Sequence, residues 1–338
     1  MAASQIDAAG HCWCGGCSLQ PLRVTVLSGA MGAAAAATAS DVAGKGARPQ
    51  QTLGRSVVVT GAGYWSGLEN RVELRPAPAG SGVVFVREDL GGLRVPVSLD
   101  HRVEAASRTN LQAGSAVVEM VEHLLSALAA LQVDCCEVGL TAAELPGLDG
   151  SAQAYVEAID VAGIVQHEAT VSPLCVAEPI VLEAADIRAR IEARPPTTAG
   201  LSVRYELDYP GKPIPPQHYG AAVTPQHYRK EIAAARTFLP EEDARRLQEQ
   251  GLGLAVTTAD LLVFGPAGPI DNTLHWPDEC ARHKVLDVVG DLSLAGRPVH
   301  ADIVAQRSGH RLNTALLAAL LTAERQQQER AGSVVREV

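Results

Sequence analysis

The first clear pattern of apolar and polar positions is an alternation with a period of two, which is typical of half-buried β-strands. It predicts strands in three segments separated by Gly and Pro: RSVVVTG (55–61), RVELRPAP (71–78) and GVVFVRED (82–89). The spacing becomes helical in AVVEMVEHLLSALAAL (116–131). After it, LPGLDGSAQAYVEAI (145–159) predicts a turn that leads into a second helix, with Asp149 or Ser151 as the N-cap.

The same order of elements recurs in the second half of the chain. The expected strands are 173–184, 187–193, 201–208, 260–264 and 300–306. The expected helices are 224–235 with Pro225 at the first helical position, 241–250 ended by Gly251, 277–294, and about 310–328. EHLLSALAAL in the first half also resembles RHKVLDVVGDL in the second, which indicates an internal duplication.

These elements predict an α+β fold of two similar domains, each a sheet layered with helices, with the active site between them. The first domain is expected at 51–170, the second at 171–330, and a short tail at 331–338. A length of 338 residues suits two domains, because a domain commonly has about 100–200 residues.

Residues 1–50 differ from the rest of the chain. They contain a run of Ala at 33–37 and only two acids, Asp7 and Asp41. Transit peptides are rich in Ser and poor in acids, and one here would place the protein in a mitochondrion or plastid. Because basic residues are sparse, a disordered extension, or a true start at Met31, explains the composition equally well, and the expected location is then the cytoplasm.

The same segment contains HCWCGGC (11–17), whose histidine and cysteines are of the types that bind zinc or form a redox pair. A redox Cys-x-x-Cys normally follows a strand and opens a helix, and neither is predicted here. The simpler interpretation is that this motif has no function.

Composition and charge exclude several classes of protein. The net charge of −10 argues against a nucleic-acid-binding protein, which needs a basic face to neutralise phosphates. No window is long and apolar enough for a membrane span, so we expect a soluble protein without stable membrane insertion. Of the seven cysteines, Cys135 and Cys136 are adjacent, which suits burial in a reducing compartment better than a disulfide framework.

One face of the helix predicted at 277–294 carries polar groups in an otherwise apolar segment. His283, Asp287 and Asp291 are spaced four residues apart, so all three lie on the same side of the helix. A histidine and an aspartate four residues apart, taken alone, more often form a surface hydrogen bond than a metal site. Two further segments favour a metal site: Glu122 and His123 are adjacent in an apolar helix, and His310 follows a Gly at a helix start.

These residue types together fill the roles of a zinc hydrolase. Two histidines and one aspartate make a catalytic zinc site, which leaves a fourth position for water. Glu122 is placed to take the proton of that water, and His310 with Asp291 is suited to protonate a leaving amine. Cations occur in the same segments and suggest a local site for an anionic substrate, although each is individually more often solvent-facing: Arg282, Lys284, Arg307 and Arg311.

Five segments resemble the UDP-3-O-acyl-N-acetylglucosamine deacetylases (LpxC), the zinc amidases of lipid A synthesis. The matching segments are VEHLLSALAAL, LDGSAQAYV, ARTF (235–238), DECARHKVLDVVGDL and SGHRLN (308–313), in the order and at about the spacings of that family. The resemblance covers the chain from about Gln51 to Leu321. It implies two similar α+β domains with the active site between them, and a substrate that is a UDP-linked acylated N-acetylglucosamine. We expect the chain to be a monomer.

The resemblance also implies a role for each site residue. Zinc would be bound by His123, His283 and Asp287, a set that equally suits Fe²⁺. Glu122 would be the general base, and His310, oriented by Asp291, the general acid or electrostatic stabiliser. The substrate would be contacted by Thr237 at the acetyl oxygen, by Phe238 along its border, and by Lys284 at its phosphates. The reaction would release acetate from the 2-amide of the glucosamine.

The sequence departs from the family pattern in three places. Trp65 in GAGYWSG (61–67) stands where a histidine is usual, and GLGLAVTTADLLVF (251–264) replaces a Gly/Ser-rich loop that shapes the acyl passage. The extension at 1–50 suggests a plant- or alga-like member. Trp65 and the altered loop leave two alternatives open: a zinc deacetylase of another N-acetyl sugar, or a degenerate nucleotide-sugar-binding homologue without activity.

Overall fold

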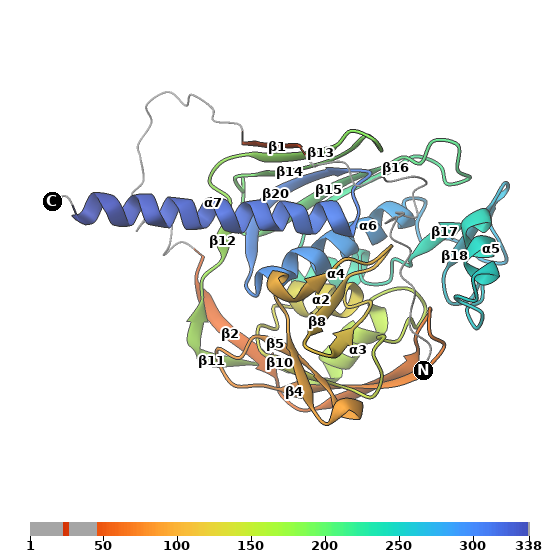
Figure 1. Ribbon diagram of the computed structural model, residues 1–338, viewed down its shortest axis with the longest axis horizontal. Helices are drawn as coiled ribbons and strands as arrows, with labels where there is room; N and C mark the ends of the chain where they lie inside the picture. The colour runs from red at the N-terminus through yellow and green to blue at the C-terminus, as the bar shows by residue number, and fades with distance from the viewer. Residues whose placement is uncertain (1–22, 27–45, 337–338) are drawn as a thin grey trace.

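The computed structural model describes residues 23–26 and 46–336. Its α+β architecture has two main sheets on opposite sides of the molecule, with helices packed between them (Figure 1). The first sheet has the strand order β3-β4-β10-β5-β6. These strands are β3 (Val57–Ala62), β4 (Glu69–Pro76), β5 (Val83–Arg87), β6 (Leu93–Pro96) and β10 (Cys136–Leu140).

The second sheet is built mainly from the second half of the chain, in the order β1-β13-β14-β20-β15-β16, with β12 paired to β20. Its central strand, β20, runs parallel to β15 and antiparallel to β14. The strands are β1 (Arg23–Val26), β12 (Leu174–Cys175), β13 (Ile180–Ala184), β14 (Ala189–Arg194), β15 (Leu201–Leu207), β16 (Gln217–Ala222) and β20 (Val299–Gln306).

Six α-helices are described, and two of them, α2 and α6, carry most of the candidate site residues. The helices are α2 (Glu122–Ala130), α3 (Gln153–Ala162), α4 (Pro225–Glu231), α5 (Glu241–Glu249), α6 (Glu279–Leu292) and α7 (His310–Arg336). In Figure 1, α2 and α6 lie between the sheets, and α7 runs along the second sheet and extends beyond the body. No helix in the described part of the chain is long and apolar enough to cross a membrane.

Three small sheets complete the architecture. They consist of β2 (Arg48–Leu53) with β11 (Ile164–Val171); of β7 (Arg102–Val103), β8 (Asn110–Ala113) and β9 (Ala116–Val118); and of β17 (Phe238–Pro240), β18 (Leu262–Gly265) and β19 (Gly268–Pro269). Short 3-10 turns lie at Glu88–Leu90, Leu99–His101 and Ser293–Ala295. The sheet β17–β19 and α5 project to one side of the body (Figure 1).

The hydrophobic core is continuous between the two halves, and α2 meets α6 at its centre. Both helices contribute fully buried aliphatic side chains, including Leu124 and Val285. Gly290 allows their backbones to approach closely, since a Cβ atom there would lie 2.2 Å from the carbonyl oxygen of Glu122. No side chain larger than hydrogen fits at this position without moving one helix.

Several sequence-based expectations need correction. Neither Asp149 nor Ser151 is the N-cap of α3, because Ala152 stands at that position, and α7 continues to Arg336, beyond the expected end near 328 and into the expected tail. The predicted helix at 116–131 is wrong over its first six positions, because Ala116–Val118 pair with β8 across a turn at Gly114 and the helix begins only at Glu122. Met120 has a left-handed φ of 58°, which no helix continues through. Regular structure also occurs within residues 1–50, where Arg23–Val26 pair with β13 and β2 begins at Arg48. HCWCGGC and most of the proposed transit peptide lie outside the described residues.

We expect Gly290→Ala to lower the free energy of unfolding by about 1–3 kcal/mol, because the added methyl group forces α2 and α6 apart. This loss outweighs the gain of about 1 kcal/mol that Ala normally brings to a helix interior. Urea unfolding measures the change. Gly309→Ala is the control, since nothing lies within 4 Å of a Cβ atom there. Equal stability of both variants would show that the helix crossing tolerates a side chain.

Candidate active site

Helices α2 and α6 bring together two imidazoles and a carboxylate at their crossing. His123 comes from the first turn of α2, and His283 and Asp287 lie one turn apart on α6. One potential ligand atom from each residue lies within 4.8 Å of the others. The rings of His123 and His283 meet edge to face, with centroids 5.0 Å apart. All three side chains are buried, so their polar atoms need partners.

The hydrogen bonds of these residues leave coordinating atoms free. The Nδ1 atom of His283 donates to the carbonyl oxygen of Ala235 at 2.9 Å, which leaves Nε2 with its lone pair toward the cluster. Lys284 donates to Oδ2 of Asp287 at 2.9 Å. Within the described chain, Oδ1 of Asp287 and Nδ1 of His123 are buried without a hydrogen-bond partner. An unpartnered carboxylate oxygen beside two imidazoles fits a divalent cation.

Burial and neighbouring charges keep these groups in the protonation states that bind metal. Burial, reinforced by the nearby His283, lowers the pKa of His123 to about 3, so its imidazole is neutral. Burial likewise lowers the pKa of His283. Burial opposes ionisation of Asp287, but the positive charge of Lys284, followed by those of the histidines when they are protonated, outweighs it and holds the pKa of this carboxyl well below its usual range. Neutral imidazoles and an ionised carboxylate are the ligand forms.

Glu122 lies next to His123 at the start of α2 and is 3% exposed. Its Oε2 atom accepts a hydrogen bond of 3.0 Å from the backbone N–H of Thr109, and its Oε1 atom lies 3.9 Å from Nε2 of His310. Burial raises the pKa of Glu122 to about 7, against the opposing effect of His310. A carboxylate with this pKa can both accept and release a proton near neutral pH.

His310, the first residue of α7, forms a buried ion pair with Asp291 of α6. Its Nδ1 atom donates to the two carboxylate oxygens of Asp291 at 3.2 and 3.0 Å. Burial acts to lower the pKa of His310, but the Asp291 carboxylate outweighs it and raises this pKa to about 9. The imidazolium form is therefore present at neutral pH, with Nε2 on the side of Glu122.

The remaining predicted residues lie beside this cluster. The ring of Phe238 is 6.2 Å from that of His283, and Nζ of Lys284 is 5.7 Å from the Phe238 centroid. Thr237 precedes Phe238 and is held by its backbone, since its N–H donates to Gly150 and its carbonyl accepts from Leu262. The structure thus places Phe238 and Lys284 beside the candidate ligands His283 and Asp287 and fixes the backbone of Thr237.

A buried ion pair that the sequence did not reveal fixes the segment around Ala235. Glu279 is fully buried and accepts two hydrogen bonds from the Arg236 guanidinium, at 2.7 and 3.1 Å, and one from the Arg236 backbone N–H at 3.1 Å. Because the Ala235 carbonyl holds His283, this pair also supports a candidate metal ligand.

Thr109 and Asn313 are two further neighbours of the site that the sequence did not single out. Both donate hydrogen bonds to Asp291. Asn313 is three residues after His310 on α7, so helical spacing could have indicated it. No local pattern marks Thr109, because its partners lie on α2 and α6.

The predicted cluster of cations is not supported for two of its members. Arg282 lies between the rings of Tyr219 and Trp276 and pairs with Asp278 and Glu231. Arg307 pairs with Asp208. These side chains are used within the fold, whereas Lys284 pairs with Asp287, one of the candidate metal ligands.

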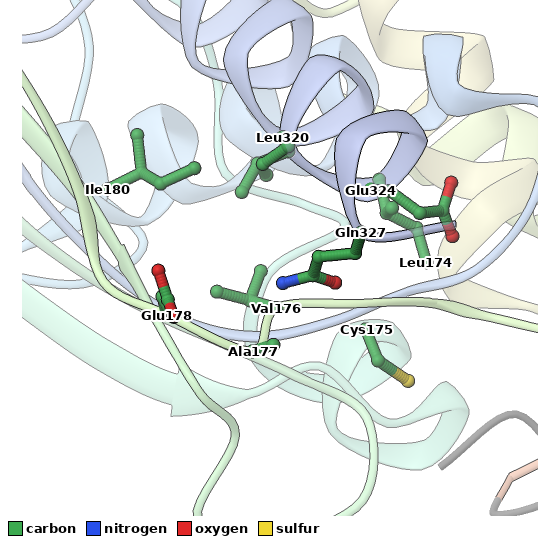
Figure 2. Close-up of a pocket in the computed structure, with 10 residues that line it drawn as sticks. Leu174, Cys175, Val176, Ala177, Glu178, Ile180, Leu320, Glu324 and Gln327 are labelled. Atoms are coloured by element: carbon green, nitrogen blue, oxygen red, sulfur yellow. The ribbon is translucent and has the colours of Figure 1, made fainter. Parts of the chain in front are cut away.

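The two internal departures from the family pattern meet in one small apolar cluster. Tyr64, Met120 and Leu261 form its buried part, and Trp65 and Val256 pack against it. The Trp65 ring also stacks on the guanidinium of Arg108, 4.8 Å from the ring centroid. A separate pocket between α7 and the 174–180 segment is lined by none of the candidate residues (Figure 2).

Comparison with known proteins agrees with this geometry. Residues 50–322 match the family described as UDP-3-O-acyl N-acetylglycosamine deacetylase (LpxC). A UDP-3-O-acyl-N-acetylglucosamine deacetylase of Solibacter usitatus is 36% identical over 275 residues, which is 81% of this chain and 92% of the relative. Proteins of the same name from Chlamydia felis and Xylella fastidiosa are 38% and 35% identical, over 80% and 81% of this chain and 95% and 90% of their own lengths.

We expect Arg236→Met to lower the free energy of unfolding by about 3–5 kcal/mol, because it leaves the Glu279 carboxylate buried without its partner. The double variant Arg236→Met/Glu279→Leu should recover most of this loss, since it buries no charge. Chemical denaturation measures both. Arg229→Met, which breaks the more exposed pair with Asp160, should cost at most about 1 kcal/mol. Equal losses in the two single variants would contradict the assignment.

Proposed function

The chain belongs to the family of UDP-3-O-acyl-N-acetylglucosamine deacetylases, and we propose that His123, His283 and Asp287 bind the zinc ion of its active site. It is a hydrolase of lipid A biosynthesis, and the reaction cleaves the 2-acetamido bond of the UDP-linked, 3-O-acylated sugar. The observation that carries the ligand assignment is the buried, unpartnered Oδ1 atom of Asp287 within reach of two neutral imidazoles. Zinc supplies a Lewis acid and makes water nucleophilic at neutral pH, and Fe²⁺ suits the same ligands.

Glu122 is the proposed general base. It lies in the first turn of α2, one residue before His123, and its Oε1 atom lies 3.9 Å from Nε2 of His310 at the crossing with α6. The buried carboxylate takes a proton from the attacking water and carries the negative charge less readily than an exposed one, as its raised pKa reflects. Proton transfer of this kind contributes about 10²–10⁴-fold to a rate.

His310 is the proposed general acid. Its imidazolium is stabilised by Asp291 through Nδ1, which leaves the Nε2 proton available on the side of Glu122. This proton goes to the amine nitrogen as its bond to the acetyl carbon breaks. Glu122 is therefore suited to accept a proton, because burial disfavours its negative charge. His310 is suited to donate one, because Asp291 keeps its imidazole protonated at neutral pH.

Three residues are proposed to bind the substrate. The Thr237 hydroxyl donates to the acetyl oxygen as negative charge develops there. Phe238 borders the sugar, since its ring already packs against His283. Lys284 meets the phosphates with a cationic group that lies at the metal ligands in an otherwise acidic protein.

We further propose a division into domains at 51–170 and 171–330, with the active site between them, and a monomeric enzyme. The ligands come from α2 on one side of this boundary and from α6 on the other. A single chain supplies every proposed site residue, so the chemistry requires no second copy.

We expect the full chain to release acetate from UDP-3-O-(3-hydroxyacyl)-N-acetylglucosamine, to lose this activity on chelation, and to regain it with one zinc per chain. The physical reason is that the ion activates the attacking water, and no hydrogen-bond donor in the described chain takes its place at Oδ1 of Asp287. Acetate release and metal content are measured on the same samples. Glu122→Ala should keep the zinc but lower kcat by about 10²–10⁴-fold. Full activity after complete metal removal would refute the metal assignment.

The activity should also fall at high pH as His310 loses its proton. Because Asp291 raises the pKa of His310 to about 9, and the protonated form is the active one, kcat/KM should decline as the pH rises through about 9. Asp291→Asn removes the charge that raises this pKa, so the alkaline limb should move to lower pH. A limb that stays in place in this variant would show that another group controls it.

A further inference from the structure

Thr109 is a fully buried polar residue that contacts both halves of the proposed proton-transfer machinery. Its hydroxyl donates a hydrogen bond of 2.6 Å to Oδ1 of Asp291, and its backbone N–H donates one of 3.0 Å to Oε2 of Glu122. Asp291 lies on α6 and Glu122 on α2. Thr109 therefore links the Asp291 carboxylate, which pairs with His310, to the Glu122 carboxylate.

The backbone around Thr109 is fixed to the start of α2 by further hydrogen bonds. Its carbonyl oxygen accepts from the N–H of Val121 at 3.1 Å, and Oδ1 of Asn110 accepts from the N–H of Met120 at 3.2 Å. The first residues of α2 have no side-chain cap of their own, since Val121 stands at the N-cap. The position of Thr109 is thus set by the same segment that carries Glu122.

The Asp291 carboxylate is held on several sides. Thr109 donates to Oδ1, Asn313 donates to Oδ2 at 2.8 Å, and Nδ1 of His310 faces both oxygens. Two donors on different oxygens resist rotation of the carboxylate about its Cβ–Cγ bond. Without the Thr109 hydroxyl, Oδ1 of Asp291 would keep only its contact with His310. Asn313 would then be the one remaining donor, apart from His310, that holds the orientation of the Asp291 carboxylate.

We propose that Thr109 is a positioning residue for the deacetylation, which fixes the Asp291 carboxylate, and through it the His310 ring, relative to Glu122. The inference rests on the proposed function of Glu122 and His310 and names a residue that acts through them. Thr109 itself does not touch the reacting atoms. Its contribution should appear in kcat, because it orients the proton donor and makes no contact with the substrate.

The experiment compares Thr109→Val with Thr109→Ser in the zinc-loaded full chain. Val keeps the shape and the backbone N–H but lacks the hydroxyl, and Ser restores the hydroxyl. With UDP-3-O-(3-hydroxyacyl)-N-acetylglucosamine, Val should lower kcat by about 10- to 100-fold with KM within about twofold. Ser should recover kcat to within about threefold. Wild-type kcat in the Val variant, or equal losses in both variants, would overturn the proposal.

Thr52→Val is the matched control. Thr52 is a buried threonine on β2 whose hydroxyl accepts a hydrogen bond from the N–H of Ala77 at 2.9 Å. The same substitution there should lower the melting temperature and leave kcat unchanged. A loss of kcat in Thr52→Val as large as in Thr109→Val would mean that the effect is one of stability alone.

A second readout does not depend on turnover. The Nδ1 proton of His310, donated to Asp291, should give a downfield resonance in the ¹⁵N-histidine-labelled protein, assigned by its loss in His310→Gln. In Thr109→Val we expect this resonance to shift or to broaden by exchange, and in Thr109→Ser to return. An unchanged resonance in the Val variant would overturn the proposal. If the wild-type chain released no acetate, the proposed function would fail, and this resonance would still decide the role of Thr109.

Discussion

The close crossing of α2 and α6 is the constraint on which the site depends. At Gly290 the two backbones are so near that a Cβ atom would meet the carbonyl oxygen of Glu122. Near this contact lie two candidate ligands, His123 and Asp287, the candidate base Glu122, and Asp291, the partner of His310. Aliphatic side chains from both sheets pack around the helices and hold them at this distance. A fraction of an ångström gained or lost at the crossing would therefore move the ligands of one helix relative to those of the other.

The cost of burying so many ionisable groups is offset within the site itself. An isolated buried charge is very unfavourable, so each needs a partner or a shifted pKa. Asp287 has Lys284, Asp291 has His310, and Glu279 has Arg236. His123 remains neutral, and Glu122 has a pKa of about 7. The same low-dielectric surroundings that demand these pairs also strengthen every electrostatic interaction made there.

The part of the site that lies on single helices is visible in the sequence, and the part that depends on contacts between distant segments is not. The i, i+4 spacing of His283, Asp287 and Asp291 indicates one polar face, and the structure places all three on the inner side of α6. Their roles, and that of Thr237, stay predictions. The predicted start of the helix that contains α2 was wrong, because the mostly apolar run at 116–121 fits a strand as well as a helix. Pairing of Ala116–Val118 with β8 decides between them. Thr109 meets Asp291 across 182 positions of sequence, which no local pattern encodes.

The two internal departures from the family pattern are better understood together than separately. Trp65 and Val256, which belong to segments far apart in the sequence, pack on the same cluster around Met120 and Leu261. A histidine at position 65 would place a polar ring against this apolar surface, whereas the indole packs there and stacks on Arg108. Because Met120 leads directly into Val121 and Glu122, the cluster adjoins the site without supplying any of its ligands. The departures thus lie beside the proposed catalytic residues, while α6 keeps the buried side chains that we propose as metal ligands, His283 and Asp287.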